Sequence, residues 1–376
     1  MPPPEDEGPP ANATVARRKL KRHRLAAAER GGEQPALLDA GGRIELLRPS
    51  AEQPALRRYV PRPEAEVTPE LCDLGVLDWR GADTSPVADI AAVANAIICG
   101  DAAQSLRRLP EASIACVITS PPYWNAVDYG VEGQVGAGGY DDYLQELLAV
   151  WRECERVLAP NGKLCINTPI LPIPKSVIAD QHTRHLKNLT NDIEATLLQG
   201  TRMQRFSLYI WQKQTTEKMF GSYPFPPNLY EQNTVEFISV LVKPGKPAVL
   251  PAAAKEPSRL SEQQWMDLTR QVWTLYPRDV KRTEHPAPFP EALPNRLIAM
   301  YTFAAAPEAG FPGDVVLDPF CGTGAACVAA KKLGRRFIGL DLSPDFAAQA
   351  ARRVAEAGHD GLIALHGEGK FAKAGA

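Results

Sequence analysis

The sequence predicts an α/β protein with a mostly parallel sheet and helices on both faces. From Ala94 onward, short apolar runs that read as strands alternate with segments of helical spacing, which is the pattern of such a sheet. Two of these runs end in loops of distinctive composition, and ligands of open α/β sheets bind at the carboxyl ends of strands. The 376 residues suffice for one large domain or two ordinary ones.

The first 92 residues differ from the rest of the chain. They are rich in Pro, Ala, Gly and charged residues with little periodicity, which is typical of a poorly ordered arm. A dense basic run from Arg17 to Arg24 reads either as a phosphate-binding segment for nucleic acid or as a solvated tail. We expect the main folded domain over residues 93–358 and a C-terminal tail over 359–376.

The first half of this domain, residues 93–242, opens with a regular alternation of elements. We expect a strand at 96–99, a helix at about 103–109, a strand at 114–118, a helix at 140–158 and a strand at 163–167. Residues 168–204 are expected to be irregular. Residues 206–211 and 235–242 read as strands, joined by a long segment that contains Phe220 to Pro227, and a loop of this length is usually functional.

The remaining residues are predicted to form a connecting segment and a second alternation. Residues 243–258 read as a Pro-rich surface excursion and 261–270 as a short helix. After them we expect a helix at 291–303, a strand at 314–318, a helix at 325–333, a strand at 336–341 and a helix capped by Ser343, with Pro344 at its first position. Residues 361–365 are a further candidate strand.

The loop from Thr119 to Trp124 follows the buried run Ile114 to Ile118. A proline cannot donate to a sheet ladder, so the strand stops there and the two prolines hold the chain extended. Ser120 offers a hydroxyl, while Tyr123 and Trp124 offer faces on which a flat ring can stack. This loop is suited to holding a planar heterocycle with an exocyclic amine.

A second loop, from Asp318 to Gly324, is glycine-rich and lies between a strand and a helix. Such a turn lets a nucleotide-like ligand approach the backbone. Asp341 ends the next strand, where a carboxylate can accept hydrogen bonds from both hydroxyls of a ribose. Since Asp318 would repel phosphate, the pattern favours an adenosine ligand with a cationic or zwitterionic tail over a dinucleotide; the alternative is an ordinary tight β-α turn.

The two loops together resemble the motifs of a known family. Asp318-Pro-Phe-Cys-Gly-Thr-Gly324 resembles the S-adenosylmethionine motif of the amino-methylating DNA methyltransferases, and Ser120-Pro-Pro-Tyr123 resembles their catalytic motif. The catalytic motif comes first, with His285-Pro-Ala-Pro-Phe-Pro290 just ahead of the cofactor strand, so the chain resembles the β-group over about residues 95–356. The resemblance implies a circularly permuted, Rossmann-like class I methyltransferase fold with one antiparallel strand.

The resemblance also assigns roles to single residues. Ser120, Pro121, Pro122 and Tyr123 would be catalytic. Asp318, Phe320, Cys321, Gly322 and Gly324 would line the methionine end of the S-adenosyl-L-methionine cofactor, and Asp341 would hold its ribose. Asp101 matches a position near the adenine ring and can equally be a helix N-cap. Phe289 matches a residue that helps to close the pocket and can equally be a core aromatic.

The chemistry explains these residue types. The lone pair of an aromatic amine is delocalised into the ring, so the Ser120 oxygen and the Pro121 carbonyl would accept its N–H bonds and aim the lone pair at the methyl group. Methylation of carbon 5 would instead need an activated cysteine, and Cys116 lies inside a strand. A paired base must be flipped out, and Tyr123 would stack on it. Trp124 either assists or packs.

The resemblance predicts methylation of the N4 amine of cytosine, because Ser at the first motif position is commonest among enzymes of that type. Methylation of the N6 amine of adenine remains the alternative within the family. A catalytically silent nucleic-acid-binding protein that keeps the cofactor fold is the alternative of another class. Residues 243–284 match the usual position of the target-recognition segment, and residues 285–358 form the cofactor-binding half.

Recognition could also involve other parts of the chain. Residues 170–204 and the Phe220 to Pro227 loop are further candidates, and basic side chains are available there for phosphate or guanine contacts: His182, Arg184, His185, Lys187, Arg202, Arg205, Lys213 and Lys218. Each of these charges can equally be a solvated surface residue.

Composition limits the partners and the compartment. The chain has 42 Lys+Arg against 44 Asp+Glu, so a nucleic-acid partner needs a local basic surface. Its seven cysteines form no CxxC pair and are expected to be core residues rather than disulfide or metal ligands. We expect a cytoplasmic, nucleoid-associated bacterial protein that acts on double-stranded DNA and does not bind a membrane. A cognate restriction endonuclease and a homodimer are further partners that the resemblance leaves open.

Overall fold

The computed structural model describes residues 57–58, 71–81, 83–124, 127–173, 185–213, 222–227, 229–275 and 289–358. The chain is divided after residue 52, and all described residues belong to the second unit, residues 53–376. The basic run Arg17 to Arg24 and the candidate strand at 361–365 lie outside the described residues.

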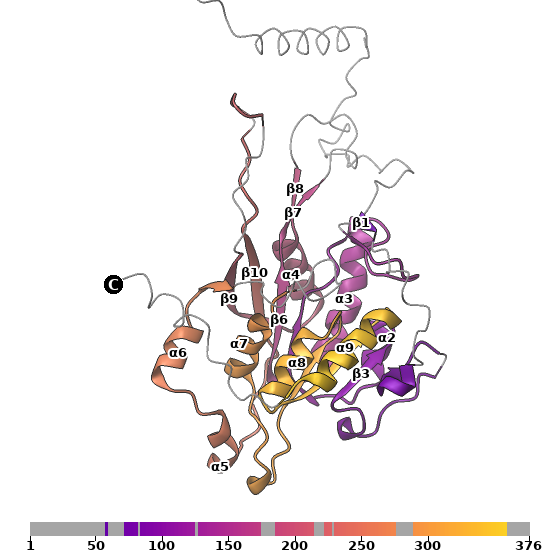
Figure 1. Cartoon of the computed structure of the whole chain (residues 1–376), viewed down its shortest axis with the longest axis vertical. Coiled ribbons are helices and arrows are strands. Elements are labelled where there is room, and N and C mark those ends of the chain that lie inside the picture. The colour runs from indigo at the N-terminus through magenta and orange to yellow at the C-terminus, as the bar shows by residue number, and fades with distance from the viewer. Residues whose placement is uncertain are drawn as a thin grey trace, which may run out of the picture. The chain divides into compact units, whose positions relative to one another are not determined.

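A nine-stranded sheet is the centre of the second unit (Figure 1). In spatial order its strands are β11 (Val272–Leu275), β9 (Gln204–Lys213), β10 (Val235–Val242), β6 (Leu158–Thr168), β4 (Ile114–Thr119), β12 (Val315–Asp318), β13 (Arg336–Asp341), β3 (Ala96–Cys99) and β2 (Leu77–Asp78). Among these nine, only β10 runs antiparallel to its neighbours. The predicted mostly parallel sheet with one antiparallel strand is therefore confirmed.

Helices cover both faces of the sheet. The first face packs against α7 (Ala292–Tyr301), α8 (Ala325–Lys332) and α9 (Pro344–Glu356). The second packs against α2 (Ala102–Arg108), α3 (Tyr140–Val157) and α4 (Leu189–Gly200). Burial on both faces explains why the central strands read as continuous apolar runs, as in other covered parallel sheets.

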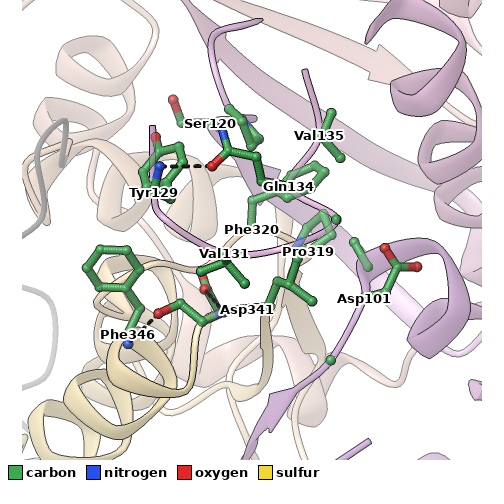
Figure 2. Close-up of a pocket in the computed structure, with 16 residues that line it drawn as sticks. Asp101, Ser120, Tyr129, Val131, Gln134, Val135, Pro319, Phe320, Asp341 and Phe346 are labelled. Atoms are coloured by element: carbon green, nitrogen blue, oxygen red, sulfur yellow. Dashed lines mark hydrogen bonds between the residues drawn. The ribbon is translucent and has the colours of Figure 1, made fainter. Parts of the chain in front are cut away.

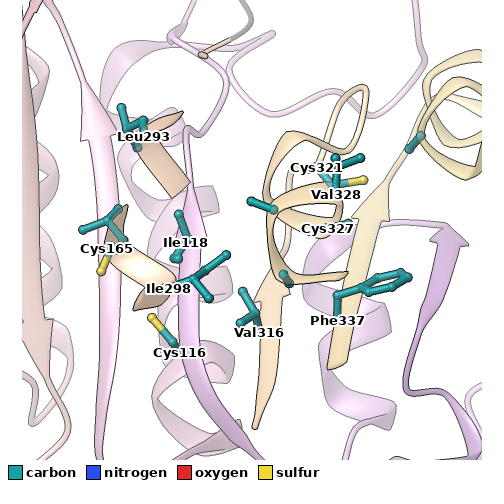
Figure 3. Close-up of a cluster of buried hydrophobic side chains, with 14 of the residues drawn as sticks. Cys116, Ile118, Cys165, Leu293, Ile298, Val316, Cys321, Cys327, Val328 and Phe337 are labelled. Atoms are coloured by element: carbon teal, nitrogen blue, oxygen red, sulfur yellow. The ribbon is translucent and has the colours of Figure 1, made fainter. Parts of the chain in front are cut away.

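The first-face core contains a group of cysteines (Figure 3). Cys116 and Cys165 lie on the paired strands β4 and β6, while Cys321 and Cys327 lie in the turn before α8 and within it. All seven cysteines are free thiols; six are buried, as predicted for small core residues, whereas Cys72 is exposed and is not a core residue. Across the described residues, no group of three or more His, Cys, Asp or Glu side chains is placed to hold a metal ion.

Smaller elements complete the unit. Two two-stranded pairs lie outside the main sheet: β1 (Arg57–Arg58) with β5 (Val127–Asp128), and β7 (Ile170–Ile173) with β8 (His185–Asn188). The remaining helical segments are η1 (Leu71–Leu74), η2 (Ile90–Ala92), α5 (Ala252–Lys255), η4 (Glu256–Ser258), α6 (Glu262–Leu268) and η6 (Pro307–Ala309). Of the helices in the described ranges, none is long and apolar enough to cross a membrane.

Several expected elements need correction. Residues 168–204 are not irregular, because they contain β7, β8 and α4. α4 begins where the Asn188 side chain caps the Asn191 N–H, and it buries a narrow stripe of Leu189, Ile193 and Leu197 among polar residues, which explains why its period is faint. β11 was also missed. The sheet further takes in β2, which precedes residue 93, where the catalytic domain was expected to begin.

The segment after β10 lies at the amino edge of the sheet, opposite the edge that carries Ser120. Lys243 pairs through its backbone with Asn161 and Gly162, at the amino-terminal end of β6. Ser258 accepts from the Ala304 backbone N–H, and it also contacts Arg335, which directly precedes β13. Residues 243–258 therefore lie at the end of the sheet away from the catalytic loop. Within the described part of residues 243–284, β11 is the strand that runs back toward that loop.

Candidate active site

A cleft of about 650 Å³, counted with the open space at its mouth, lies where the central strands end (Figure 2). Four strand ends contribute to it: Asp101 follows β3, Ser120 follows β4, Phe320 follows β12 and Asp341 ends β13. Residues far apart in the sequence thus meet at one edge, as expected for ligand sites of open α/β sheets.

The catalytic loop is fixed by hydrogen bonds on both sides. The Ser120 hydroxyl lies 2.5 Å from the Tyr123 hydroxyl and 3.2 Å from the Asn167 backbone carbonyl, to which it donates. The Pro122 carbonyl accepts a 2.8 Å bond from the buried Tyr143 hydroxyl. Ser120 and Pro122 line the cleft, Pro121 is buried, and Tyr123 is half-buried beside them. The loop is therefore rigid where the reaction is predicted to occur.

Trp124 packs rather than entering the cleft. Its indole N–H donates to the Gly138 carbonyl at 3.2 Å, and its ring meets Tyr140 edge-on at 5.0 Å. A Cβ at Gly136 would lie 3.0 Å from the Trp124 Cα, so glycine permits this close approach. Of the two roles considered for Trp124, these contacts support packing.

Asp318 is a buried carboxylate with one unpaired oxygen. Its Oδ1 accepts from the Thr119 hydroxyl at 2.7 Å and from the Phe320 N–H at 3.1 Å, whereas Oδ2 is buried and has no hydrogen-bond partner among the described residues. Burial raises the pKa of Asp318 to about 7, and nearby Asp341 adds to the increase. A buried unpaired oxygen is costly, so this atom indicates a missing donor.

Asp341 joins two segments of the cleft. Its Oδ2 accepts the Gly322 backbone N–H at 2.8 Å and its Oδ1 accepts the Ser343 N–H at 2.9 Å. Burial raises its pKa to about 6, against the lowering effect of these two bonds. Each carboxylate oxygen keeps a second lone pair, so the residue can still accept bonds from a ligand.

Of the other predicted cofactor residues, some line the cleft and others pack behind it. Asp101 caps α2 by accepting the Gln104 N–H at 2.8 Å, and it also lines the cleft, so the cap leaves its predicted position near the adenine ring possible. Cys321 is 5% exposed and belongs to the first-face core. Gly324 adopts a φ of +79° and lies against α9, where a Cβ would meet the Ala350 Cβ at 3.0 Å. Phe289 packs against the same core and does not line the cleft.

The wall of the cleft facing the strand ends was not predicted. It is formed by a loop that includes Tyr129, Val131, Gln134 and Val135, together with Phe346 of α9 (Figure 2). Gln134 accepts the Tyr129 N–H at 2.9 Å, and the Tyr129 and Phe346 rings meet edge-on at 6.2 Å. The only sequence signal for this loop was its position directly after the catalytic motif.

A polar group beside the catalytic loop was also missed. Asn167 lies next to the end of β6 and Glu236 lies near the start of β10, and the Asn167 Nδ2 and Glu236 Oε2 atoms are 2.6 Å apart. Two signals were available: Asn167 directly follows an apolar run next to the catalytic strand, and Glu236 is a lone charge inside an apolar strand.

The basic residues predicted to contact DNA have protein partners wherever they are described. Arg202 pairs with Glu155 at 3.0 Å, Arg205 pairs with Glu194, and Lys213 pairs with Glu236 at 3.0 Å. Lys187 lies 3.9 Å from the centre of the Tyr140 ring. Arg202 and Arg205 remain largely exposed. His182, Arg184 and Lys218 lie outside the described residues.

The cleft suits a cationic nucleoside. S-adenosylmethionine carries a sulfonium and an ammonium group, and the carboxylates of Asp101 and Asp341 line the cleft. Asp318 is buried directly behind the lining residues Pro319 and Phe320, with its Oδ2 unpaired among the described residues. The unpaired Asp318 oxygen can accept from an ammonium group, and Asp341 can accept from ribose hydroxyls. The residues present therefore fit the predicted cofactor.

The sheet order, with its antiparallel β10 and the Asp318 turn following the catalytic strand in sequence, is that of a permuted Rossmann-like methyltransferase. A family model described as DNA methylase, N6_N4_Mtase, matches residues 114–352, and the chain belongs to that family. The Type II methyltransferase M.XycI of Xanthomonas campestris pv. cyanopsidis is 28% identical over 277 residues, covering 68% of this chain and 86% of that protein. The DNA adenine methyltransferase YhdJ of Escherichia coli is 27% identical over 283 residues, covering 71% and 84%.

Solved structures agree with this assignment. TTHA0409 of Thermus thermophilus, assigned as a DNA modification methylase and solved with S-adenosyl-L-methionine, is 31% identical with a TM-score of 0.55, covering 69% of this chain and 94% of that one. The cytosine-N4-specific PvuII DNA methyltransferase has a TM-score of 0.51 over 69% of this chain and 85% of its own, and at 17% identity it supports the fold alone.

Proposed function

We propose that this protein is a site-specific DNA methyltransferase that transfers a methyl group from S-adenosyl-L-methionine to the exocyclic N4 amine of cytosine in double-stranded DNA. The observation that carries the proposal is the position of Ser120, which lines the carboxylate-rich cleft while its hydroxyl belongs to the rigid Ser-Pro-Pro-Tyr loop. The Ser120 side chain therefore lies between the cleft that would hold the methyl donor and Tyr123, on which the target base would stack.

The cofactor supplies an electrophilic methyl group on a sulfonium. Asp318 would hold its ammonium end, Asp341 its ribose hydroxyls and Asp101 its adenine end, while Phe320 provides an apolar wall. Phe289, Cys321, Gly322 and Gly324 would act on the cofactor through the shape of the turn and the packing beneath it.

The amine is activated by orientation alone. The Ser120 oxygen and the Pro121 carbonyl would each accept an N–H bond, which directs the nitrogen lone pair at the methyl group and stabilises developing positive charge. The target base must leave the duplex to reach this loop, and Tyr123 would stack on it. No covalent base intermediate is required: the N–C bond would form as the methyl–sulfur bond breaks, S-adenosylhomocysteine would leave, and the extra amine proton would pass to solvent.

Adenine N6 methylation is the second candidate. YhdJ, to which 71% of this chain aligns, is a DNA adenine methyltransferase. A hydroxyl can accept from either amine, so the Ser120 geometry is compatible with both bases, and the family preference for Ser in cytosine enzymes favours cytosine.

We place the recognition surface on the segments that leave the catalytic edge of the sheet. The β7–β8 pair follows directly on β6, and the connection between β9 and β10 ends just before Glu236. Tyr223 and Phe225 in this connection are 74% and 73% exposed, and Ser222 holds their turn through bonds with Phe225. The expected recognition segment, 243–284, begins at the opposite edge, and its residues 276–284 lie outside the described part.

The decisive experiment identifies the product. The protein is incubated with radiolabelled S-adenosyl-L-methionine and mixed-sequence duplex DNA, which is then digested to nucleosides. We expect label on N4-methylcytosine. Label on N6-methyladenine alone would contradict the cytosine assignment, label on carbon 5 would contradict the mechanism, and cofactor binding without transfer to any DNA would favour a silent binding protein.

We further expect cytoplasmic action at the nucleoid, alone or beside a cognate restriction endonuclease. A homodimer is the expected assembly if each subunit reads half of a symmetric site. Sedimentation with and without DNA tests the dimer.

A further inference from the structure

Four polar side chains form a cluster beside the catalytic loop. They come from separate elements: Tyr123 from the loop, Asn167 from the end of β6, Lys213 from the end of β9 and Glu236 from the start of β10. Asn167 is 2% exposed and Glu236 is 8% exposed. The backbone carbonyl of Asn167 accepts the Ser120 hydroxyl, so the cluster adjoins the wall of the cofactor cleft.

Glu236 is the centre of this cluster. Its Oε2 accepts the Asn167 amide at 2.6 Å and lies 3.4 Å from the Tyr123 hydroxyl, while its Oε1 pairs with Lys213 at 3.0 Å. A buried carboxylate is tolerated only when such partners compensate for its lost hydration. A carboxylate that also touches the catalytic loop therefore has a role in arranging that loop.

The carboxylate fixes the orientation of the Asn167 amide. A carboxylate can only accept, so the end of the amide 2.6 Å from Glu236 must be the NH₂ group. The amide oxygen Oδ1 then points elsewhere, and it is buried without a hydrogen-bond partner in the described part of the chain. An unpaired oxygen at this depth indicates that a ligand supplies a donor.

The same constraint acts on Ser120. Its hydroxyl proton goes to the Asn167 backbone carbonyl, so the 2.5 Å contact with Tyr123 is made with the Tyr123 hydroxyl as donor. The single Tyr123 proton is then directed mainly at Ser120 and only weakly at Glu236 Oε2, which is 3.4 Å away. The Ser120 oxygen retains one lone pair. Ser120 Oγ contacts the backbone of Asn167, and the unpaired Asn167 Oδ1 is a further acceptor beside this loop. An exocyclic amine has two N–H donors: one would go to Ser120, and the second would be shared between the Pro121 carbonyl and Asn167 Oδ1.

We propose that Glu236 is a positioning residue that sets the hydrogen-bond polarity of the target-base pocket, so that Asn167 presents an acceptor to the amine and the pocket rejects bases with a keto oxygen at that position. The inference rests on the proposed function, because it assumes that the base enters beside Ser120. It applies equally to cytosine and to adenine, since both carry an exocyclic amine and their deaminated forms carry a keto oxygen.

The test compares the wild-type protein with Glu236→Gln. A glutamine can offer its own NH₂ group to Asn167, which allows the Asn167 amide to turn and to present a donor. We expect kcat to fall by up to roughly 10²-fold, the lower end of the loss seen when one positioned hydrogen-bonding group is removed, with cofactor affinity within twofold of wild type. Glu256→Gln is the matched control, because Glu256 is an ion-paired but exposed carboxylate on a different segment.

A second readout separates positioning from a purely structural role. The probe is a duplex that carries the mapped target site, with the target base either intact or replaced by its deaminated analogue, uracil for cytosine or hypoxanthine for adenine. We expect wild-type protein to bind the duplex with the intact amino base more tightly than the duplex with the deaminated base. The Glu236→Gln variant should lose most of this difference in affinity. A Glu236→Gln variant that loses kcat but keeps the wild-type difference in affinity between the two duplexes would overturn the proposal. An unchanged kcat in this variant would also overturn it.

Asn167→Leu keeps the proposal testable if Glu236→Gln does not fold. This variant removes the acceptor while keeping the branched shape of the side chain, and a folded Asn167→Leu protein that still binds the amino duplex in preference to the keto duplex would overturn the inference. The proposed function fails separately: wild-type protein that transfers no methyl group to any DNA contradicts it, whereas transfer to adenine leaves the role of Glu236 unaffected.

Discussion

Gly322 donates its backbone N–H to the Asp341 carboxylate over 2.8 Å, and this bond joins the turn after β12 to the end of β13. Ser343 occupies the other carboxylate oxygen at 2.9 Å. Asp341 therefore stabilises the walls of the cleft as well as offering acceptors to a ribose. A substitution there should affect cofactor binding before it affects the chemistry.

Asp341→Ala is expected to weaken cofactor binding. The substitution removes the carboxylate that would accept hydrogen bonds from the two ribose hydroxyls of the cofactor. Hydrogen bonds to a charged acceptor are worth about 1.5–3 kcal/mol each, so the Kd for S-adenosyl-L-methionine should rise at least roughly tenfold. Titration calorimetry measures the affinity, and turnover at saturating cofactor should fall much less. An unchanged Kd, or an equal loss of turnover and affinity with a lowered Tm, would contradict a specific role in binding.

Ser120→Ala is expected to reduce turnover far more than cofactor affinity, the opposite of Asp341→Ala. Removing the hydroxyl takes away an acceptor for the amine, so kcat should fall roughly 10²- to 10³-fold, while the cofactor Kd changes by less than threefold. Ser113→Ala is the control, because Ser113 precedes the other end of β4 and donates to the Pro110 carbonyl. Full turnover of Ser120→Ala would remove Ser120 from the mechanism.

Cofactor affinity is expected to rise with pH up to about 7, where burial has raised the pKa of Asp318. The cofactor-free folded protein retains this proton, whereas the unfolded chain loses it near the ordinary value of 3.8. The stability contributed by the group is thus present at low pH and lost as the pH rises from about 4 to about 7. A bound cation favours the carboxylate, so binding below pH 7 should release a proton.

Calorimetry in buffers of different ionisation enthalpy counts that proton. Asp318→Asn should bind more weakly, with a pH dependence confined to the region below about pH 6, where Asp341 titrates. Wild-type affinity that is constant between pH 5.5 and 8 would show that Asp318 does not face the cationic part of the cofactor.

Exposed aromatic residues can locate the recognition surface. Tyr223→Ala with Phe225→Ala should raise the KM for DNA and leave the cofactor Kd unchanged, because both side chains extend from the connection between β9 and β10. Trp265→Ala is the matched comparison, since Trp265 is 62% exposed within residues 243–284. A raised KM in the Trp265 variant alone would favour that segment instead.

Gly339→Ala is expected to destabilise the fold. An added Cβ would lie 2.7 Å from the Cys327 sulfur, 2.9 Å from Ile97 Cδ1 and 3.0 Å from the Cys321 sulfur, in the core of Figure 3. Overpacking of this kind costs about 1–3 kcal/mol, which denaturant unfolding can measure. Gly81→Ala should be near neutral, because no atom lies within 4 Å of its added Cβ.

The elements that could be predicted are those marked by neighbouring residues in the sequence, such as an apolar run or a helix cap. β3, β10 and β13 begin and end where their apolar runs do, and Ser343 caps α9 as expected. The cleft carboxylates were also found, since each follows a strand. Contacts that depend on register could not be predicted: Asn167 meets Glu236, 69 residues away, only because β6 and β10 pair with Ile238 opposite Asn167.

The order of strands also determines when the domain can assemble during synthesis. β3 and β4 are close in sequence, yet β12 and β13 lie between them in the sheet. A nascent chain that has not reached β12 therefore holds two separate pieces of sheet with unpaired edges. Because such non-local pairing is slow and leaves intermediates prone to aggregation, we expect a ribosome-stalled chain that ends before Asp314 to depend on chaperones.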